Sequence, residues 1–339
     1  MAGMQTWLKS SAFPLWLVFA VLLAVLFPQW VLSGGLMLAE LSTKWGVWVI
    51  FFLLGLSLPL EQLSSGYKPL RLQIFVLSWN FIGFPLLVFG GVLLLGCWMP
   101  VDLKMGFGLL AIMPTTIASA VTFTQFSGGR VENAIVATVA SNVLAVLVVP
   151  LLCVAYFQLG TAVAIPMLPL LVKISSLILL PLILGQVVRA RFPGKSLRIS
   201  LRSKPISQGI ILFIVHVAFA KSVSAGDFGQ LSVMTLVGLL GGVLMLLATV
   251  SCLTWWTSAW LRFERGSRIA VFYCASQKSI ATGLPLSTAV LAALPQPMDS
   301  ALILMPLILY HPLQLLLAGV VCGRIGSVEL AVDHRALGL

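Results

Sequence analysis

A lysine inside an apolar stretch is the most unusual feature of this sequence of 339 residues. Lys278 lies within Phe272–Thr288 (FYCASQKSIATGLPLST), where amide and hydroxyl side chains gather ahead of apolar sequence. A charge in the middle of a membrane costs roughly 2.5–3.5 kcal/mol on insertion scales, and such residues mark functional sites. Gly283 and Pro285 predict an interrupted helix, whose freed backbone groups need protein or water around them. The stretch therefore predicts a polar site at membrane depth.

A counterpart of this stretch lies in the first half of the chain. Met113 to Gln125 (MPTTIASAVTFTQ) again places a proline, Pro114, and several hydroxyl groups inside an apolar run. Interrupted segments at corresponding places in two halves are the best sequence indication of a transporter's binding site. We therefore interpret the chain as a membrane transporter in which both stretches contribute to the binding site.

The composition excludes a soluble protein. Hydrophobic residues make up 60% and charged residues 9% of the chain, whereas soluble domains carry about 25% charged residues. Apolar runs of about 17 residues or more recur along the whole length, which predicts an all-α polytopic membrane protein. The five cysteines show no Cys-x-x-Cys spacing, so no disulfide framework or metal site is expected. No catalytic base or nucleotide loop accompanies Lys278, so we expect no enzyme activity and no catalytic residue.

Ten transmembrane helices fit the apolar runs, five in residues 1–160 and five in residues 161–339. An odd number of helices in each half makes the second half enter the membrane from the opposite side. This arrangement predicts an inverted repeat and transport by alternating access, with the interrupted stretches as helices 4 and 9. The expected spans are about 14–32, 44–60, 70–97, 103–126, 133–157, 167–188, 206–222, 230–260, 269–293 and 301–322.

Basic residues predict the orientation of the chain. With the N-terminus inside, 15 of the 20 Lys and Arg residues fall in inner loops. The positive-inside rule then places both termini in the cytoplasm, in a plasma (bacterial inner) membrane. The net charge of +11 is explained by this topology and by attraction to anionic lipid head groups, so no nucleic acid partner is expected. Arg189–Lys204 is expected to be an inner loop that fixes orientation, and the oligomeric state stays open.

Three alternatives remain for Lys278, because none of the nine acidic residues falls in the middle of a span. Desolvation could keep the amine neutral. The amine could instead be charged and held by Gln277, Ser279 and carbonyl groups at helix ends. Its counter-charge could also be a substrate anion, which the positive ends of half-helices attract.

Other polar groups inside the spans have both structural and functional interpretations. Hydroxyl groups often bond to their own helix instead of a ligand. His311 could relay protons or donate to a carbonyl near Pro312. Thr138 and Asn142 are four residues apart, share one helix face and offer oxygens to a small cation. The candidate binding residues are Asn80, Thr115, Thr116, Ser119, Thr122, Thr138, Asn142, Gln277, Lys278, Ser279, Thr282 and His311.

Several of these segments are similar to those of a known family. NFIGFP (80–85), TFTQFSGG (122–129), QKSIATGLPL (277–286) and YHP (310–312) resemble the bile acid:sodium symporter family, solute carrier family 10. The likeness is strongest to the branch related to its seventh member. The resemblance implies ten helices in a 5+5 inverted repeat. A panel domain would come from helices 1, 2, 6 and 7 and a core domain from helices 3–5 and 8–10, with broken helices 4 and 9 crossing near the midplane.

The resemblance also implies which residues of this chain correspond to the family's sodium ligands. By position these ligands fall on Asn80, Ser119, Thr138, Asn142 and Gln277. The family pattern has an asparagine where this chain has Ala120, a glutamate at Tyr273 and an asparagine at Lys278. A hard cation needs oxygen ligands and negative charge. We therefore expect no cofactor and no sodium coupling of the family type.

Two functional hypotheses follow. The first is a secondary transporter of a small organic anion, not coupled to sodium at the family's sites. The alternative is a non-transporting membrane regulator of ion homeostasis that acts through partners, since the resemblance includes relatives linked to calcium handling. Substrate-dependent stabilisation and flux in liposomes distinguish the first from the second, whereas the second predicts a protein that co-purifies.

Overall fold

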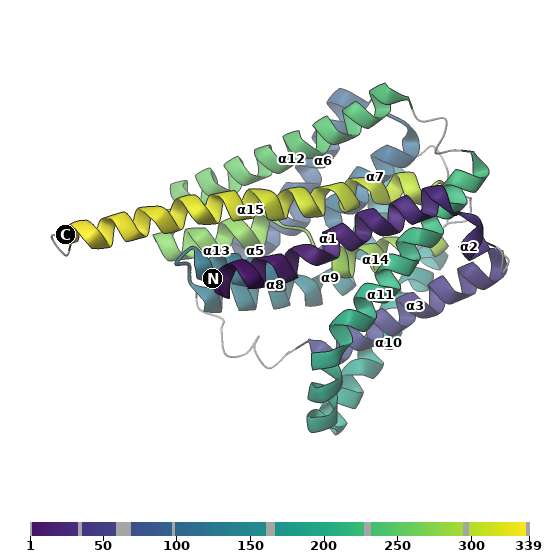
Figure 1. The fold of residues 1–339 in the computed structure, drawn as a ribbon, viewed down its shortest axis with the longest axis horizontal. Helices are drawn as coiled ribbons and strands as arrows, with labels where there is room; N and C mark the ends of the chain where they lie inside the picture. The colour runs from purple at the N-terminus through teal and green to yellow at the C-terminus, as the bar shows by residue number, and fades with distance from the viewer. Residues whose placement is uncertain are drawn as a thin grey trace.

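The computed structural model describes residues 2–32, 36–58, 69–96, 99–160, 167–226, 232–293 and 298–336, and these ranges contain helices and no strand. Figure 1 shows their arrangement. The helices are α1 (Ala2–Leu26), α2 (Gln29–Leu32), α3 (Leu36–Ser57), α5 (Leu70–Ser78), the π-helical turn η1 (Trp79–Gly83), α6 (Phe84–Leu95), α7 (Val101–Ile112), α8 (Ala118–Phe126), α9 (Val131–Gly160), α10 (Met167–Arg191), α11 (Pro193–Ala225), α12 (Val233–Trp260), α13 (Arg265–Ser276), α14 (Ile280–Ala293) and α15 (Ser300–Ala336).

Long apolar helices dominate the fold. A helix satisfies its own backbone hydrogen bonds, which is the requirement for crossing lipid. Large apolar side chains such as Leu94, Trp256 and Trp260 are exposed on the outside, as lipid-facing residues are. The prediction of an all-α polytopic membrane protein is confirmed. Within the described ranges, seven spans are long and apolar enough to cross a membrane: Leu38–Ser57, Leu70–Leu94, Val131–Tyr156, Leu171–Arg191, Pro193–Ala225, Val233–Trp260 and Ser300–Ile325.

One group of helices consists of α1, α3, α10 and α11. In Figure 1, α10 and α11 run obliquely to α12 and α15. α3 packs on α10 and α11, and α1 packs on α11. Gly55 and Gly185 allow the backbones of α3 and α10 to approach closely, because a Cβ at either glycine would overlap a carbonyl oxygen of the other helix. Gln186 then donates to the carbonyl oxygens of Gly55 (2.6 Å) and Leu58 (3.0 Å) at the end of α3.

The remaining helices pack around α15 and α9. α15 contacts α7, α12 and α14, and α9 contacts α5, α7, α8 and α13. Tyr310 and Ala301 of α15 are completely buried, as are Val149 and Ala145 of α9. These two helices therefore form the support against which the shorter helices α7, α8, α13 and α14 are held.

The basic segment Arg189–Lys204 differs from the sequence prediction. The sequence predicts an inner loop there, but α10 continues to Arg191 and α11 begins at Pro193, so that only Phe192 separates the helices. Proline at the first helical position favours this start, because its fixed φ suits a helix and its missing N–H is not needed there. The Ser196 hydroxyl also donates to the carbonyl oxygen of Val188 (3.3 Å) across the turn.

Candidate functional site

The candidate site is built around two places where a helix stops and a second helix begins a few residues later. α7 ends at Ile112 and α8 begins at Ala118; α13 ends at Ser276 and α14 begins at Ile280. We call residues 113–117 the first break and residues 277–279 the second break. Met113 (φ −68°, ψ 147°) and Gln277 (φ −94°, ψ 143°) have extended backbones. The N–H of Ser279 donates to the carbonyl oxygen of Pro114 at 2.8 Å, so the two breaks touch directly.

Pro114 lies in the first break, but the expected interruption at Gly283 and Pro285 is wrong in position. Both residues lie inside α14, and the break precedes them. The reason is a helix cap: the hydroxyl of Ser279 accepts the N–H of Thr282 at 3.2 Å, which starts the helix before Gly283. Gly283 has a packing role, since a Cβ there would lie 2.9 Å from Leu307 Cδ2.

Lys278 is fully buried, and its Nζ contacts three backbone carbonyl oxygens. Nζ donates to Ala111 O (2.8 Å), Met113 O (2.8 Å) and Asn80 O (3.2 Å). We call these three oxygens the carbonyl cage. The ring of Phe84 adds a cation–π contact, with its centroid 4.1 Å from Nζ. An ammonium group has three N–H donors, so the carbonyl cage occupies all of them.

Local helix geometry explains why these oxygens are available. Phe84 N–H donates to Trp79 O in the π-helical turn, and Pro85 has no N–H, so the next turn offers no donor to Asn80 O. Thr115 N–H, which a continuous α7 would direct at Ala111 O, donates instead to Ser141 Oγ (3.3 Å). The negative end of the α7 dipole also faces the amine, which favours a positive charge there.

Among the three alternatives for Lys278, the geometry fits a charged amine held by helix-end carbonyls. Gln277 and Ser279 are not among its acceptors, which differs from the expectation. A neutral amine would direct its lone pair at one of the carbonyl oxygens. In this conformation the ammonium has no N–H left for a substrate anion, because all three face the carbonyl cage.

Gln314 and Tyr310 of α15 hold the backbone of the second break. Gln314 accepts the Lys278 N–H at its Oε1 (2.7 Å) and donates from Nε2 to the Lys278 carbonyl (2.8 Å). The Tyr310 hydroxyl donates to Ser276 O at 2.7 Å. His311 accepts at Nδ1 from Gln314 Nε2 (2.9 Å), which joins it to the same group of contacts. Sequence reasoning missed Gln314 and Tyr310 as site residues, although Tyr310 is the first residue of the YHP segment and Gln314 follows that segment closely.

Two smaller polar groups join residues that the sequence singled out. Ser119 Oγ donates to Gln277 Oε1 at 2.7 Å. Asn142 Nδ2 donates to Thr115 O (2.8 Å), and Asn142 Oδ1 accepts from Thr282 Oγ1 (3.0 Å). The structure places the remaining candidates as follows: Asn80 in η1, Thr116 in the first break, Thr122 exposed on α8, Thr138 on α9 and Ser279 in the second break, where its hydroxyl also bonds to Thr282 Oγ1 at 3.3 Å.

The residues that depart from the family pattern are buried. The Tyr273 hydroxyl pairs with Ser127 Oγ at 2.8 Å, and its ring stacks on Phe123 with centroids 5.7 Å apart. Ala120 is completely buried and supplies no ligand oxygen from its side chain. Within the described ranges no cluster of three or more His, Cys, Asp and Glu residues could hold a metal ion.

Some buried polar atoms at the site have no partner among the described residues. These atoms are Gln277 Nε2, Thr115 Oγ1 and Asn80 Oδ1. A buried polar group without a partner costs about 1–3 kcal/mol, and in a native protein such a group needs an explanation such as a ligand. They are therefore the groups best suited to contact a substrate.

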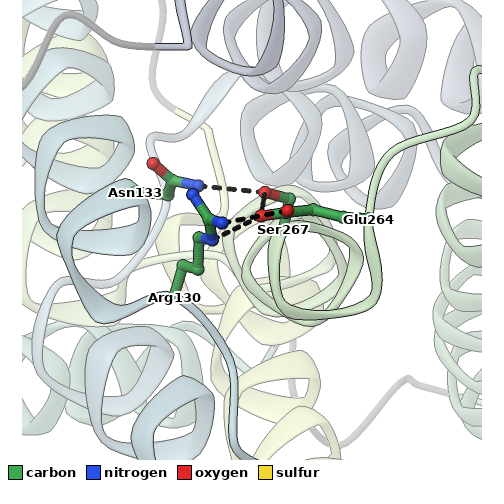
Figure 2. Close-up of polar contacts among 4 residues, drawn as sticks. All are labelled: Arg130, Asn133, Glu264 and Ser267. Carbon is green, nitrogen blue, oxygen red and sulfur yellow. Dashed lines mark hydrogen bonds and ion pairs between the residues drawn. The ribbon is translucent and has the colours of Figure 1, made fainter.

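A further polar cluster joins the far ends of α8 and α13. Figure 2 shows Arg130, Asn133, Glu264 and Ser267 in mutual contact. Arg130 forms an ion pair with Glu264 and donates to its Oε2 from Nη2 at 2.9 Å. Asn133 Nδ2 donates to Ser267 Oγ (3.1 Å), which donates to Glu264 Oε1 (3.2 Å). The cluster ties the turn after α8 to the turn before α13, so both half-helices are fastened to each other away from the breaks.

Comparison with known proteins decides the family. The sequence model of the SBF-like CPA transporter family matches residues 11–327. The chain belongs to this family. SBF-like relatives include a putative symporter, YfeH, of Escherichia coli, which is 31% identical with 92% of each chain covered. Sodium/bile acid cotransporter 7 of Danio rerio is 28% identical with 94% of each chain covered, and that of Mus musculus is 28% identical over 94% of this chain and 93% of its own.

These matches confirm the resemblance seen in the sequence. The SBF-like chain is a membrane protein of a transporter family, with relatives named as symporters and cotransporters. These names describe transporters, which points to transport and not to catalysis. A transporter family also implies a small-molecule substrate.

Proposed function

We propose that this SBF-like protein is a secondary transporter of a small organic anion that works by alternating access without sodium at the family's sites. The observation that carries this proposal is the side-chain nitrogen of Lys278 in its carbonyl cage, at the contact of the two breaks, where three acceptors suit the ammonium form. A fixed positive charge at the site favours an anionic substrate and opposes a second cation.

The oxygens at the inferred sodium positions support the same conclusion. Ser119 donates to Gln277, Thr138 Oγ1 donates to Ile135 O (3.0 Å), and Asn142 Oδ1 accepts from Thr282. No carboxylate stands at any of these positions, and Tyr273 occupies the place of the family's glutamate. A hard cation prefers several oxygens with negative charge, so this set of residues does not suit sodium.

The arrangement of the helices supports a 5+5 inverted repeat over residues 1–160 and 161–339. The seven long spans, the shorter apolar segment Phe13–Leu26 and the two interrupted pairs, α7–α8 and α13–α14, together give ten spans. In this proposal α1, α3, α10 and α11 form the panel domain and the other helices form the core domain. The broken helices cross at the Ser279–Pro114 hydrogen bond.

The substrate would bind beside the second break. The N-termini of α8 and α14 begin at the two breaks, and helix N-termini attract anions. Gln277 Nε2 supplies an unpartnered donor there. The name of the relative sodium/bile acid cotransporter 7 includes bile acid, which is an organic anion. The alternative of a non-transporting regulator of calcium homeostasis is not favoured, because the chain belongs to a transporter family with relatives named as symporters and cotransporters.

We also propose a plasma membrane location, the inner membrane in a bacterium, with both termini in the cytoplasm. The free ends of α1 and α15 lie toward the same side of Figure 1, in keeping with an even number of spans. The inner loops with their basic residues would then face anionic lipid.

The experiment is a substrate screen with a matched variant. Purified protein is tested against a panel of organic anions by thermal stability, and each hit is followed by uptake into proteoliposomes. We expect at least one anion to stabilise the protein and to be transported. Gln277→Ala should lose both effects, whereas Gln125→Ala, an exposed glutamine on α8, should retain them. Absence of stabilisation and of uptake with every anion would contradict the proposal.

A further inference from the structure

The carbonyl cage around Lys278 has the chemistry of a site for a monovalent cation. Its oxygens are all backbone carbonyls, from Asn80, Ala111 and Met113, at 2.8–3.2 Å from Nζ. Rings of backbone carbonyls are the ligands with which proteins replace the hydration shell of an alkali cation. These oxygens are distinct from the side chains at the inferred sodium positions; Asn80 belongs to both sets, but contributes to the cage through its main chain.

The cage would be costly if it held no positive charge. Ala111 O and Met113 O lie at the end of α7, where the helix dipole is negative and the usual N–H donors are missing. Asn80 O lacks a donor because of the π-helical turn and Pro85. Asn80 also has an unpartnered Oδ1. Three buried carbonyl oxygens from two separate helices therefore depend on one ammonium group that comes from the second break.

We propose that the carbonyl cage is a monovalent-cation site that the protein occupies permanently with its own Lys278. The side chain acts as a tethered cation that joins η1, α7 and the second break without any dissolved ion. A truncated side chain should leave the carbonyls free to bind K⁺, Na⁺ or NH₄⁺ from solution. This proposal stands on the cage geometry and does not depend on the proposed transport function.

The test is rescue of a truncated variant by small cations. Thermal unfolding of the purified full-length protein is measured in KCl, NaCl, NH₄Cl and N-methyl-D-glucamine chloride at equal ionic strength. The wild-type protein should have the same Tm in all four salts. Lys278→Ala should be several degrees less stable in N-methyl-D-glucamine, whose cation is too large for the cage, and should regain stability in a saturable manner with at least one small cation.

Two control variants separate charge from packing. Lys278→Met fills the space with an apolar chain of similar length, so it should be destabilised in every salt and rescued by none. Among the described residues Lys173 Nζ contacts one helix-end carbonyl, Ala293 O at 3.4 Å, so Lys173→Ala should show no cation-selective effect. Equal stability of Lys278→Ala in all four salts would overturn the proposal.

A folding failure of Lys278→Ala still gives a result. In that case the yield of monodisperse protein is compared after membranes are solubilised in each of the four salts. Recovery only in small cations supports a cation site, and failure in all four contradicts it. Because no substrate enters these measurements, a negative result here leaves the uptake experiments on organic anions unaffected.

Discussion

Among single residues, Lys278 and Gln314 determine how the second break is held. Lys278 uses its side chain to bond to the end of α7 and to η1, while its own backbone N–H and carbonyl both bond to Gln314. An unwound backbone inside a membrane is tolerated only where protein or water satisfies it. These two residues therefore satisfy the backbone groups that the interrupted helices would otherwise leave without partners.

Replacement of Gln314 should destabilise the protein strongly. Gln314→Ala leaves one buried N–H and one buried carbonyl without a partner, each at a cost of about 1–3 kcal/mol. We expect a clear fall in Tm, measured by thermal unfolding in detergent. Gln314→Glu keeps the acceptor for the Lys278 N–H but loses the donor, and should fall between Gln314→Ala and the wild type. The exposed glutamine variant Gln125→Ala serves as the control, and equal stability of Gln125→Ala and Gln314→Ala would refute this role.

At the level of helices, close approach and short caps position the site. α3 and α10 meet at Gly55 and Gly185, and α14 starts at the Ser279 cap. The half-helices α8 and α13 are joined by the cluster around Arg130 and Glu264 (Figure 2). Each of these contacts fixes an end or a crossing of a helix.

Gly185→Ala should disrupt the contact of α3 with α10. A Cβ there would overlap Phe52 O and crowd the backbone of Leu56, and overpacking costs typically about 1–3 kcal/mol. Gly209→Ala is the matched control, because a Cβ at Gly209 in α11 meets no atom within 4 Å. The control should be neutral or more stable by about 0.5–1 kcal/mol. Thermal unfolding compares the two variants, and equal Tm values would show that the close approach is unimportant.

Charge reversal tests the connection between α8 and α13. Arg130 and Glu264 are each about half exposed, so their ion pair should contribute about 0.2–1 kcal/mol. Arg130→Glu and Glu264→Arg should each lower the Tm slightly, and the double exchange should recover part of the loss. The recovery should diminish at high salt because screening weakens exposed ion pairs. Additive losses in the double variant would mean that the pair makes no contribution.

The sequence predicted the parts of the site that depend on local composition. Pro114 marked the first break, and Lys278 stood out because apolar sequence surrounds a charge. It could not predict the carbonyl cage, because Asn80 and Ala111 lie 198 and 167 positions away from Lys278. Gly283 and Pro285 gave the wrong position for the second break. The start of α14 is set by the Ser279 cap and not by the residues that weaken a helix. Hydropathy likewise could not predict that the basic segment 189–204 is helical.

In the molecule as a whole, the four-helix group meets the remaining helices at α9, α14 and α15. α14 packs on α3, α10 and α11, whereas α8 packs chiefly on α13 and α9, and α13 packs on α12, α8 and α9. Two polar contacts lie on the same side: Ser222 Oγ donates to Asp299 Oδ2 (2.9 Å), and Lys173 Nζ donates to Ala293 O (3.4 Å). With the proposed topology this is the outer side, so these contacts join the two groups of helices there.

Thiol labelling tests this arrangement. In a background without the native cysteines, Thr122→Cys on α8 should react with a membrane-impermeant reagent from the cytoplasmic side, since Thr122 is exposed. Ser287→Cys on α14 should not react from either side, because Ser287 is only 1% exposed. Labelling in right-side-out and inside-out vesicles distinguishes the sides. Reaction of Ser287→Cys from the outside would contradict the burial of this face of α14.

The most direct test of the account is the sodium dependence of uptake. The initial rate of uptake of a validated organic anion into proteoliposomes is measured with a Na⁺ gradient, with a K⁺ gradient and with neither. Because a built-in ammonium stands at the site and the inferred sodium positions lack a carboxylate, we expect the same rate in all three conditions. A rate that rises with the Na⁺ gradient alone, and loses that rise in Asn142→Ala, would contradict it.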